Sequence, residues 1–423
     1  MPNPSVVIAS ISLAIWLYLA LARGNFWSFR PFDGDEATHP APSTWPDVTA
    51  VIPARNEAET IARTIASLSQ QNYPSKLSIV VVDDHSEDAT AKLAQESAQS
   101  NRTNATAARE VTILSAPPLQ PGWTGKLSAL NAGVLFATRE GAASAVPRSD
   151  AVNEALAPAA SAPTYLWFTD ADIVHAPDTL TRLVARAERN NLDLTSLMVL
   201  LRAQTLPERF LIPPFLFFFL MLYPPKKIAN PKSQTAGAAG GCILIRRTAL
   251  DRIGGLTAIR SEVIDDCALA RAVKNSAAAR STFAAKIPRP KIWMGLTRKS
   301  RSLRAYTTFA EIRDMIARTA FTQLHYSALL LIGTLLGLAI TYLAPAALLF
   351  VHDTPTRVIA LTTWLIMSLL FLPTVRYYRI SIHWAATLPL AAAFYAAATV
   401  LSALRYWTNR GAQWKGRSQA PPL

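Results

Sequence analysis

The chain has 423 residues, of which 51% are hydrophobic and 17% charged, which is apolar for a soluble protein and suggests a globular domain with membrane segments. The net charge of +14 is not gathered into one run, which disfavours a nucleic-acid tail and favours anionic headgroups or a phosphorylated substrate. The two cysteines exclude a disulfide framework and are expected to be small buried residues in a reducing compartment.

An uncharged apolar run covers residues 6–22 and is followed by Arg23 and Arg30. It predicts an uncleaved membrane anchor within residues 1–30, with the basic side in the cytoplasm. A cleaved signal peptide is the alternative, but no basic side chain precedes the run and no clear cleavage site follows it. Residues 31–47, which contain Pro and Ala, are expected to be a linker.

From Val48 onward, β-branched runs alternate with segments of helical periodicity. The pattern predicts a mostly parallel sheet with helices on both faces, in a domain that covers residues 48–300. Residues 137–163 are rich in Ala, Ser and Pro and are expected to be a flexible surface insertion. The predicted strands are 48–54, 77–84 and 111–115, and the predicted helices are 57–70 and 89–97.

The carboxyl-terminal part is dominated by apolar stretches that are long enough to span a bilayer. A membrane region is therefore expected at 326–404, after an interfacial helix at 301–325 and before a basic tail at 405–423. The three predicted spans are 326–351, 358–375 and 384–404.

Two features of the membrane region stay open. The stretch 210–223 is interpreted as an interfacial segment, as the floor of an acceptor cleft, or as a plain core helix. Three spans would also place the basic tail on the side opposite to the α/β domain, although Lys and Arg prefer the cytoplasm. Either one segment is re-entrant or the number of spans is wrong by one.

Acidic pairs stand where predicted strands end, and open α/β sheets bind ligands at these ends. The three pairs are Asp83 and Asp84, Asp170 and Asp172, and Asp265 and Asp266. We expect them to converge on one cleft.

The stretch LWFTDADIV places Asp170 and Asp172 one residue apart after an apolar strand. On an extended backbone these side chains would face the same side, where they could hold Mg²⁺ or Mn²⁺ together with substrate phosphates. The alternative is a turn and N-cap before a helix that begins near Asp178.

Seven motifs occur in order along the chain: VIPARNEAETI, SLSQQNYP, IVVVDDHSEDAT, GWTGKLSALNAG, FTDADI, GGCILIRR and EVIDDCALA. Together they resemble the membrane-bound family-2 glycosyltransferases, which have the GT-A fold. The resemblance covers residues 47–300. It is closest to the glycosyltransferases associated with hopanoid biosynthesis.

The resemblance implies a role for each matching residue. The implied roles are contact with the nucleotide for Pro53, Arg55, Glu57, Asp83 and Asp84, contact with the diphosphate for Lys126, binding of ribose and metal for Asp170 and Asp172, and general base for Asp266. An N-cap is the alternative for Asp266, although Asp265 is the more natural cap.

One motif departs from the processive members of the family, which carry QxxRW. Here Arg298 and Arg301 occur without a Trp, so the stacking platform for a growing glycan is missing. This favours transfer of a single sugar. The two arginines are expected either to bind the diphosphate or to be solvated cations beside the membrane.

The resemblance thus implies an inverting enzyme, dependent on Mg²⁺ or Mn²⁺, that moves one sugar from a nucleotide-diphosphate sugar to a membrane lipid such as a hopanoid. Transfer to polyprenyl phosphate is one alternative, and that acceptor needs no strong base. An inactive membrane scaffold that binds nucleotide sugars is another. The expected location is the bacterial inner membrane, with several spans and a cytoplasmic catalytic domain, and no nucleic-acid partner.

Overall fold

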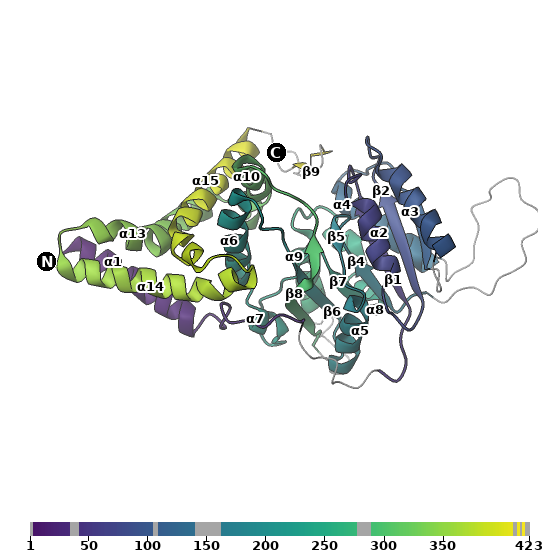
Figure 1. Ribbon diagram of the computed structural model, residues 1–423, viewed down its shortest axis with the longest axis horizontal. Coiled ribbons are helices and arrows are strands. Elements are labelled where there is room, and N and C mark those ends of the chain that lie inside the picture. Colours follow the sequence, from purple (N-terminus) through teal and green to yellow (C-terminus); the bar gives the residue numbers. More distant parts are fainter. Residues whose placement is uncertain are drawn as a thin grey trace, which may run out of the picture. The chain divides into compact units, whose positions relative to one another are not determined.

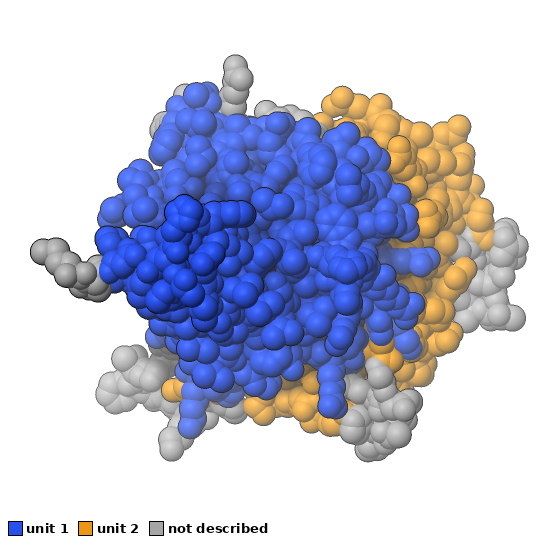
Figure 2. Space-filling model, turned by 60° about the vertical axis from the view of Figure 1, so that its left-hand side comes forward, with its two compact units in different colours: residues 1–32, 200–237, 294–423 blue, residues 33–199, 238–293 orange. Residues whose placement is uncertain are grey.

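The computed structural model describes residues 3–33, 42–104, 109–139, 162–276, 289–408, 413–414 and 417–418 (Figure 1). The chain divides into two compact units, which Figure 2 colours blue and orange. Unit 1 consists of Met1–Phe32, Leu200–Gly237 and Met294–Leu423, and unit 2 of Asp33–Val199 and Ala238–Trp293. The predicted insertion and basic tail lie mostly outside the described residues, and so does part of the predicted linker.

Unit 2 is built on a mixed β-sheet, in which β1 to β4 are parallel as the sequence predicts and β7 is not. Its strands lie in the order β3-β2-β1-β4-β7-β6. Strands β1 to β4 are parallel to one another, whereas β7 is antiparallel to both β4 and β6. The strand bounds are β1 Val48–Ala54, β2 Leu77–Asp83, β3 Glu110–Ser115, β4 Tyr165–Phe168, β5 Ile173–Val174, β6 Leu194–Leu200 and β7 Ile243–Arg246.

The central strands are continuous apolar runs because both of their faces are covered. All residues of β1 are buried, and helix α4 packs so closely on it that a Cβ added to Gly133 would lie 2.3 Å from Val51 Cγ1. The helices of unit 2 are α2 Ile61–Ser69, α3 Thr90–Asn104, α4 Gly125–Arg139, α5 Thr179–Asn190, α8 Arg247–Arg252 and α9 Asp265–Asn275.

Unit 1 is mainly helical. Helix α1 is part of its core, since Trp16 is fully buried and donates a hydrogen bond to the backbone oxygen of Thr341. Strand β8, Ile292–Ser302, starts in unit 2 and continues into unit 1. The main helices are α1 Pro4–Leu21, α6 Leu206–Leu222, α7 Pro225–Ala229, α10 Phe309–Ala317, α11 Ala320–Gln323, α12 Ala328–Leu338, α13 Ala344–Ala347, α14 Thr354–Tyr377 and α15 Leu388–Trp407.

Among the described residues, five helical segments are long and apolar enough to cross a membrane, by length and composition. They are Pro4–Leu21, Leu206–Ala229, Ala328–Phe350, Thr354–Tyr377 and Ile382–Trp407. Four of them match the predicted anchor and spans. The fifth contains α6, which the sequence analysis took to be shorter.

Helix α6 buries one side completely within unit 1, which agrees with the interpretation of this stretch as a core helix. Its fully buried residues include Leu211, Ile212, Phe217 and Leu220. The single interfacial helix expected before the spans is instead two short helices, α10 and α11.

Candidate active site

The carboxyl ends of β1, β2 and β4 lie at one edge of the sheet because the three strands are parallel. Ala54 at the end of β1 is in register with Asp83 of β2, and Val51 is in register with Phe168, the last residue of β4. The sequence-predicted donor residues of these strands therefore share one edge of unit 2, where open α/β sheets bind ligands.

Lys126, in the first turn of α4, joins two of the acidic pairs. Its Nζ lies 3.0 Å from Asp170 Oδ1 and 3.1 Å from Asp265 Oδ2. Burial opposes the charge of Lys126, but the carboxylates of Asp170, Asp265 and Asp266 raise its pKa well above the ordinary value. The ammonium is therefore a permanent counter-charge to this acidic cluster.

Asp266 is held by two backbone donors at the start of α9. The Gly240 N–H donates to its Oδ2 at 2.9 Å, and the Cys267 N–H donates to its Oδ1 at 2.7 Å. Burial, together with the neighbouring charge of Asp265, raises the pKa of Asp266 to about 6, against the lowering effect of Lys126 and of these hydrogen bonds. The Asp266 carboxylate is thus held in one orientation and titrates near pH 6.

The expectation that Asp265 caps α9 is wrong. The helix begins at Asp265 itself, the N-cap is Ile264, and no side chain makes a capping hydrogen bond there. Because Asp265 points its carboxylate at Lys126, it is not available to the helix end.

These groups line a small cavity in unit 2, with Pro53 and Thr169 also at its wall. Its volume is about 10 Å³, which is the space of about one water molecule. Gly240 lies against the same groups, since a Cβ added there would be 3.3 Å from Lys126 Nζ and 3.4 Å from Asp266 Oδ2. The Lys126 side chain thus lies between the carboxylates of Asp170 and Asp265.

Asp170 and Asp172 do not lie on an extended backbone, so an extended backbone does not turn their side chains to the same side, as had been expected. The Ile173 N–H donates to the Asp170 backbone oxygen at 3.3 Å, which closes a turn. Asp170 faces the cavity, whereas Asp172 is 8% exposed and is not among the cavity residues. The turn alternative is therefore correct for the backbone. The binding of a metal ion by the side chains of Asp170 and Asp172 stays a prediction.

The side chains of Thr169 and His175 stabilise this turn, and neither was expected from the sequence. Thr169 Oγ1 lies 2.9 Å from His175 Nε2 and 3.0 Å from the Gly241 backbone oxygen. Burial lowers the pKa of His175 to about 3, so the ring is neutral at physiological pH.

Arg55 ties together the loops that follow β1 and β2. Its guanidinium donates to the backbone oxygens of Asp84 at 2.6 Å and His85 at 2.9 Å, and it pairs with Glu87 at 3.1 Å. Asn56, with a φ of 51°, adds a hydrogen bond from the Glu87 N–H at 2.8 Å. Arg55 therefore shapes the predicted nucleotide site through its loops.

Asp83 is the last residue of β2, and Glu57 lies in the loop that follows β1. Asp83 Oδ1 is buried and has no hydrogen-bond partner among the described residues, although its Oδ2 accepts from the Ser86 N–H at 3.3 Å. Such an orphaned acceptor is costly unless a ligand donor completes it. Glu57 holds the loop through its backbone N–H, which donates to Thr90 Oγ1 at 2.7 Å.

Two predicted donor residues lie outside this cluster. Arg298 and Arg301 belong to the part of β8 in unit 1. Arg298 lies over the Tyr377 ring, 5.9 Å from its centroid, and Arg301 is exposed. Their expected contact with the diphosphate stays a prediction.

Comparisons with known proteins agree with this architecture. A family model described as "Glycosyltransferase like family 2" matches residues 46–288. No curated protein matches the chain. Among solved structures, the mannosyltransferase PcManGT from Pyrobaculum calidifontis, in complex with GDP-Man and Mn²⁺, matches with a TM-score of 0.57 and 19% identity over 96% of this chain and 99% of that chain.

A second solved structure, S. aureus TarS 1-349 in complex with UDP-GlcNAc, matches with a TM-score of 0.37 and 14% identity over 86% of this chain and 92% of that chain. The likeness to PcManGT shows the fold, and the family model covers more than half of the 423 residues. The chain therefore belongs to glycosyltransferase family 2 and is a glycosyltransferase with a GT-A-like fold.

Proposed function

We propose that this glycosyltransferase moves one sugar from a nucleoside diphosphate sugar to a membrane lipid, with inversion and with the help of a divalent metal, and that a hopanoid is the acceptor. The observation that carries the proposal is the cluster of Lys126, Asp170, Asp265 and Asp266 at the ligand-binding edge of the sheet. The GDP-Man and Mn²⁺ of PcManGT support the donor class and the metal. The hopanoid rests on the resemblance of the motifs.

Asp266 is the proposed general base. Its carboxylate takes the proton of the acceptor hydroxyl while that oxygen bonds to the anomeric carbon, and the bond from this carbon to the diphosphate oxygen breaks. The nucleoside diphosphate leaves with the bonding electrons. A pKa of about 6 suits this task because the group is ionised at neutral pH and is still more basic than an ordinary aspartate.

Lys126 is the proposed ligand of the diphosphate. The cavity beside Lys126 has a volume of only about 10 Å³, and in this proposal the diphosphate draws the Lys126 ammonium away from at least one of its carboxylate partners. A diphosphate offers the ammonium several charged oxygens in exchange. Donor binding would thereby free Asp170 or Asp265.

The carboxylates suit a divalent metal. Mg²⁺ is usually held by one or two carboxylates, with substrate phosphates and water completing its shell. Asp170 and Asp172 would supply the carboxylates, and the ammonium within 3.0 Å of Asp170 marks this position as one that attracts a cation. When bound, the metal would stabilise the charge that develops on the leaving diphosphate.

The proposed location is a membrane, with several spans and unit 2 in the cytoplasm. Helix α6 adds no crossing, because the strands on either side of it in the sequence are paired neighbours: Leu194 of β6 is in register with Ile245 of β7. A single crossing would place these strands on opposite sides of the bilayer. The Tyr326 and Tyr406 rings stack 4.3 Å apart, so the start of the first carboxyl-terminal candidate span and the end of the last lie side by side. This supports the alternative in which one of these three segments does not cross the membrane.

The proposal is tested with the purified full chain in detergent, a panel of UDP- and GDP-sugars, Mn²⁺ or Mg²⁺, and a lipid extract that contains hopanoids. We expect a glycolipid that forms only with metal and is lost in Asp170→Asn. Asp178→Asn serves as the control, since that side chain pairs with Arg182 outside the cavity. Donor binding without any glycolipid product would favour the scaffold alternative. A product formed only on polyprenyl phosphate would show that the acceptor is polyprenyl phosphate and not a hopanoid.

A further inference from the structure

A second cavity lies in unit 1 and uses none of the residues assigned to the sugar donor in unit 2. Its volume is about 760 Å³, within the range of small-molecule sites. Three arginines line it, Arg304, Arg318 and Arg405, together with the tyrosines Tyr306, Tyr326 and Tyr406. Such a lining offers several cationic and hydroxyl donors to one ligand.

The acidic residues of this cavity are already engaged. Asp314 Oδ1 accepts from Arg405 at 2.7 Å and from Arg313 at 3.0 Å. Glu311 Oε2 accepts from the backbone N–H groups of Thr307 at 2.6 Å and Thr308 at 3.2 Å.

By contrast, the exposed Arg318 side chain forms no hydrogen bond or ion pair with the part of the chain that the structure describes. The lining carries three arginines against two carboxylates, those of Glu311 and Asp314, so the cavity has a net charge of +1.

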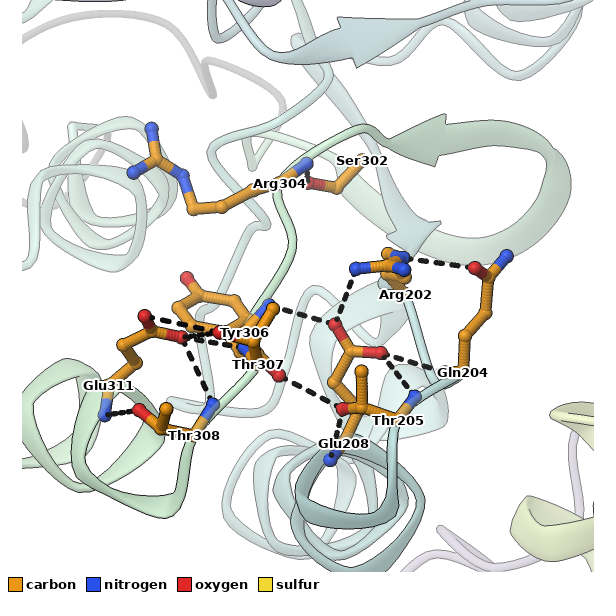
Figure 3. A network of polar contacts seen from close by, with 10 residues as sticks. All are labelled: Arg202, Gln204, Thr205, Glu208, Ser302, Arg304, Tyr306, Thr307, Thr308 and Glu311. Carbon is orange, nitrogen blue, oxygen red and sulfur yellow. Dashed lines mark hydrogen bonds and ion pairs between the residues drawn. The ribbon is translucent and has the colours of Figure 1, made fainter.

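The segment that carries Arg304 and Tyr306 is fastened to α6 by one buried carboxylate (Figure 3). Glu208 is fully buried and accepts from the Tyr306 N–H at 2.8 Å, from the Thr205 N–H at 2.9 Å and from Arg202 at 3.3 Å. In Figure 3 the Arg304 guanidinium extends away from Glu208. This wall of the cavity is therefore held in place before any ligand binds.

Aromatic residues place the cavity at the level of lipid headgroups. Tyr326 immediately precedes the candidate span that begins at Ala328, and Tyr406 lies at the end of the candidate span that finishes at Trp407. The Tyr326 and Tyr406 rings stack with their centroids 4.3 Å apart, so these two span ends lie at the same depth. Tyr and Trp are typical of the membrane–water interface.

We propose that this cavity binds the phosphate group of a membrane lipid. Arg304 and Arg318 would donate charge-assisted hydrogen bonds to the phosphate oxygens, and the tyrosine hydroxyls would complete the contacts. The lipid is either a bulk anionic phospholipid or a phosphate-bearing polyprenyl chain, and both present the same chemistry to the arginines.

Native mass spectrometry of the full chain in a neutral detergent tests the proposal. The probes are phosphatidylglycerol, phosphatidylcholine with the same acyl chains, a polyprenyl phosphate, and inorganic phosphate. The variants are Arg304→Gln and Arg318→Gln. Arg209→Gln is the matched control, since Arg209 is an exposed arginine of unit 1 that does not line the cavity.

We expect an anionic lipid to bind at least tenfold more tightly than phosphatidylcholine, and each cavity variant to weaken this binding about tenfold, as expected for the loss of a charged hydrogen bond. The control should bind like the wild type. Tighter binding of phosphatidylglycerol identifies a bulk phospholipid, and tighter binding of polyprenyl phosphate identifies the polyprenyl lipid. Equal binding of phosphatidylcholine, equal loss in Arg209→Gln, or binding of inorganic phosphate as tight as that of any lipid would overturn the proposal. Nucleotide-sugar binding, measured in parallel, should be the same in all variants, which separates this site from the donor site.

Discussion

The ammonium of Lys126 lies 3.0 Å from the carboxylate of Asp170, although the two residues come from different elements, the start of α4 and the turn after β4. The same ammonium reaches Asp265 at 3.1 Å. Lys126 neutralises the acidic cluster and is also the proposed ligand of the diphosphate. Donor binding would therefore release the carboxylate of Asp170 or Asp265.

Replacing Lys126 with Gln should weaken the binding of the nucleotide sugar. The loss of a charged contact with the diphosphate corresponds to about a 10- to 100-fold rise in the dissociation constant of the donor. Isothermal titration calorimetry with nucleoside diphosphate measures this directly. Lys92→Gln is the control, because Lys92 is exposed and pairs with Glu96 on the surface of α3. Unchanged affinity in Lys126→Gln would remove Lys126 from the donor site.

The rate of transfer should depend on the ionisation of Asp266. A base works only when deprotonated, so kcat should rise as the pH increases through about 6 and level off above about 7. The pH profile of single-turnover transfer between pH 5 and pH 8 provides the test. A rate that is flat over this range, or that falls as the pH rises through 6, would contradict the assignment of Asp266.

Adding one methyl group at Gly240 should displace the side chains of the candidate site and leave the rest of the fold unchanged. The new Cβ would lie 3.3 Å from Lys126 Nζ and 3.4 Å from Asp266 Oδ2. We expect Gly240→Ala to lower kcat about tenfold or more, since small misplacements of reacting groups are costly. Gly337→Ala is the matched control because its added Cβ meets nothing within 4 Å. Wild-type kcat in Gly240→Ala would show that the position tolerates the crowding.

The buried His175 should make the stability of unit 2 sensitive to acid. Its pKa is lowered from 6.5 to about 3 by burial, so the unfolded chain binds more protons between these values. The free energy of unfolding should therefore fall as the pH drops from about 6.5 towards 3, by about 1.4 kcal/mol per pH unit from this group.

The measurement is the urea midpoint of the wild type and of His175→Gln at several pH values. The variant should lose stability less steeply with falling pH than the wild type. His352→Gln, at an exposed histidine, should follow the wild type. Parallel slopes for wild type and His175→Gln would exclude His175 as the sensitive group.

The sequence predicted β1, β2 and β3 because their signal is local, whereas β6 and β8 were not predicted. The run VTAVIPA is apolar except for Thr49, and β1 covers those seven residues. The same holds for β2, whose β-branched run ends at an aspartate. The edge of the sheet that carries the candidate site follows from these strands by the topology of parallel sheets.

The contacts within the site were not predictable in the same way. The bridge from Lys126 to Asp265 joins residues far apart in the sequence, and no local pattern encodes it. The turn at Asp170 depends on Thr169 and the buried His175, which look like ordinary polar residues in the sequence. The first turn of α6 was missed because the charged residues Glu208 and Arg209 interrupt the apolar run there, whereas the structure buries Glu208 and bonds it to backbone N–H groups.

The most direct test of the central claim is single-turnover transfer by Asp266→Asn, measured beside its donor affinity. Asn keeps the shape, but its single oxygen can accept only one of the Gly240 and Cys267 N–H groups, which donate to different oxygens of Asp266, and it cannot take a proton. We predict that the transfer rate falls about 10²- to 10⁴-fold while the dissociation constant of the nucleotide sugar changes little. A variant that transfers sugar to the lipid at the wild-type rate would contradict the account of Asp266 as the base.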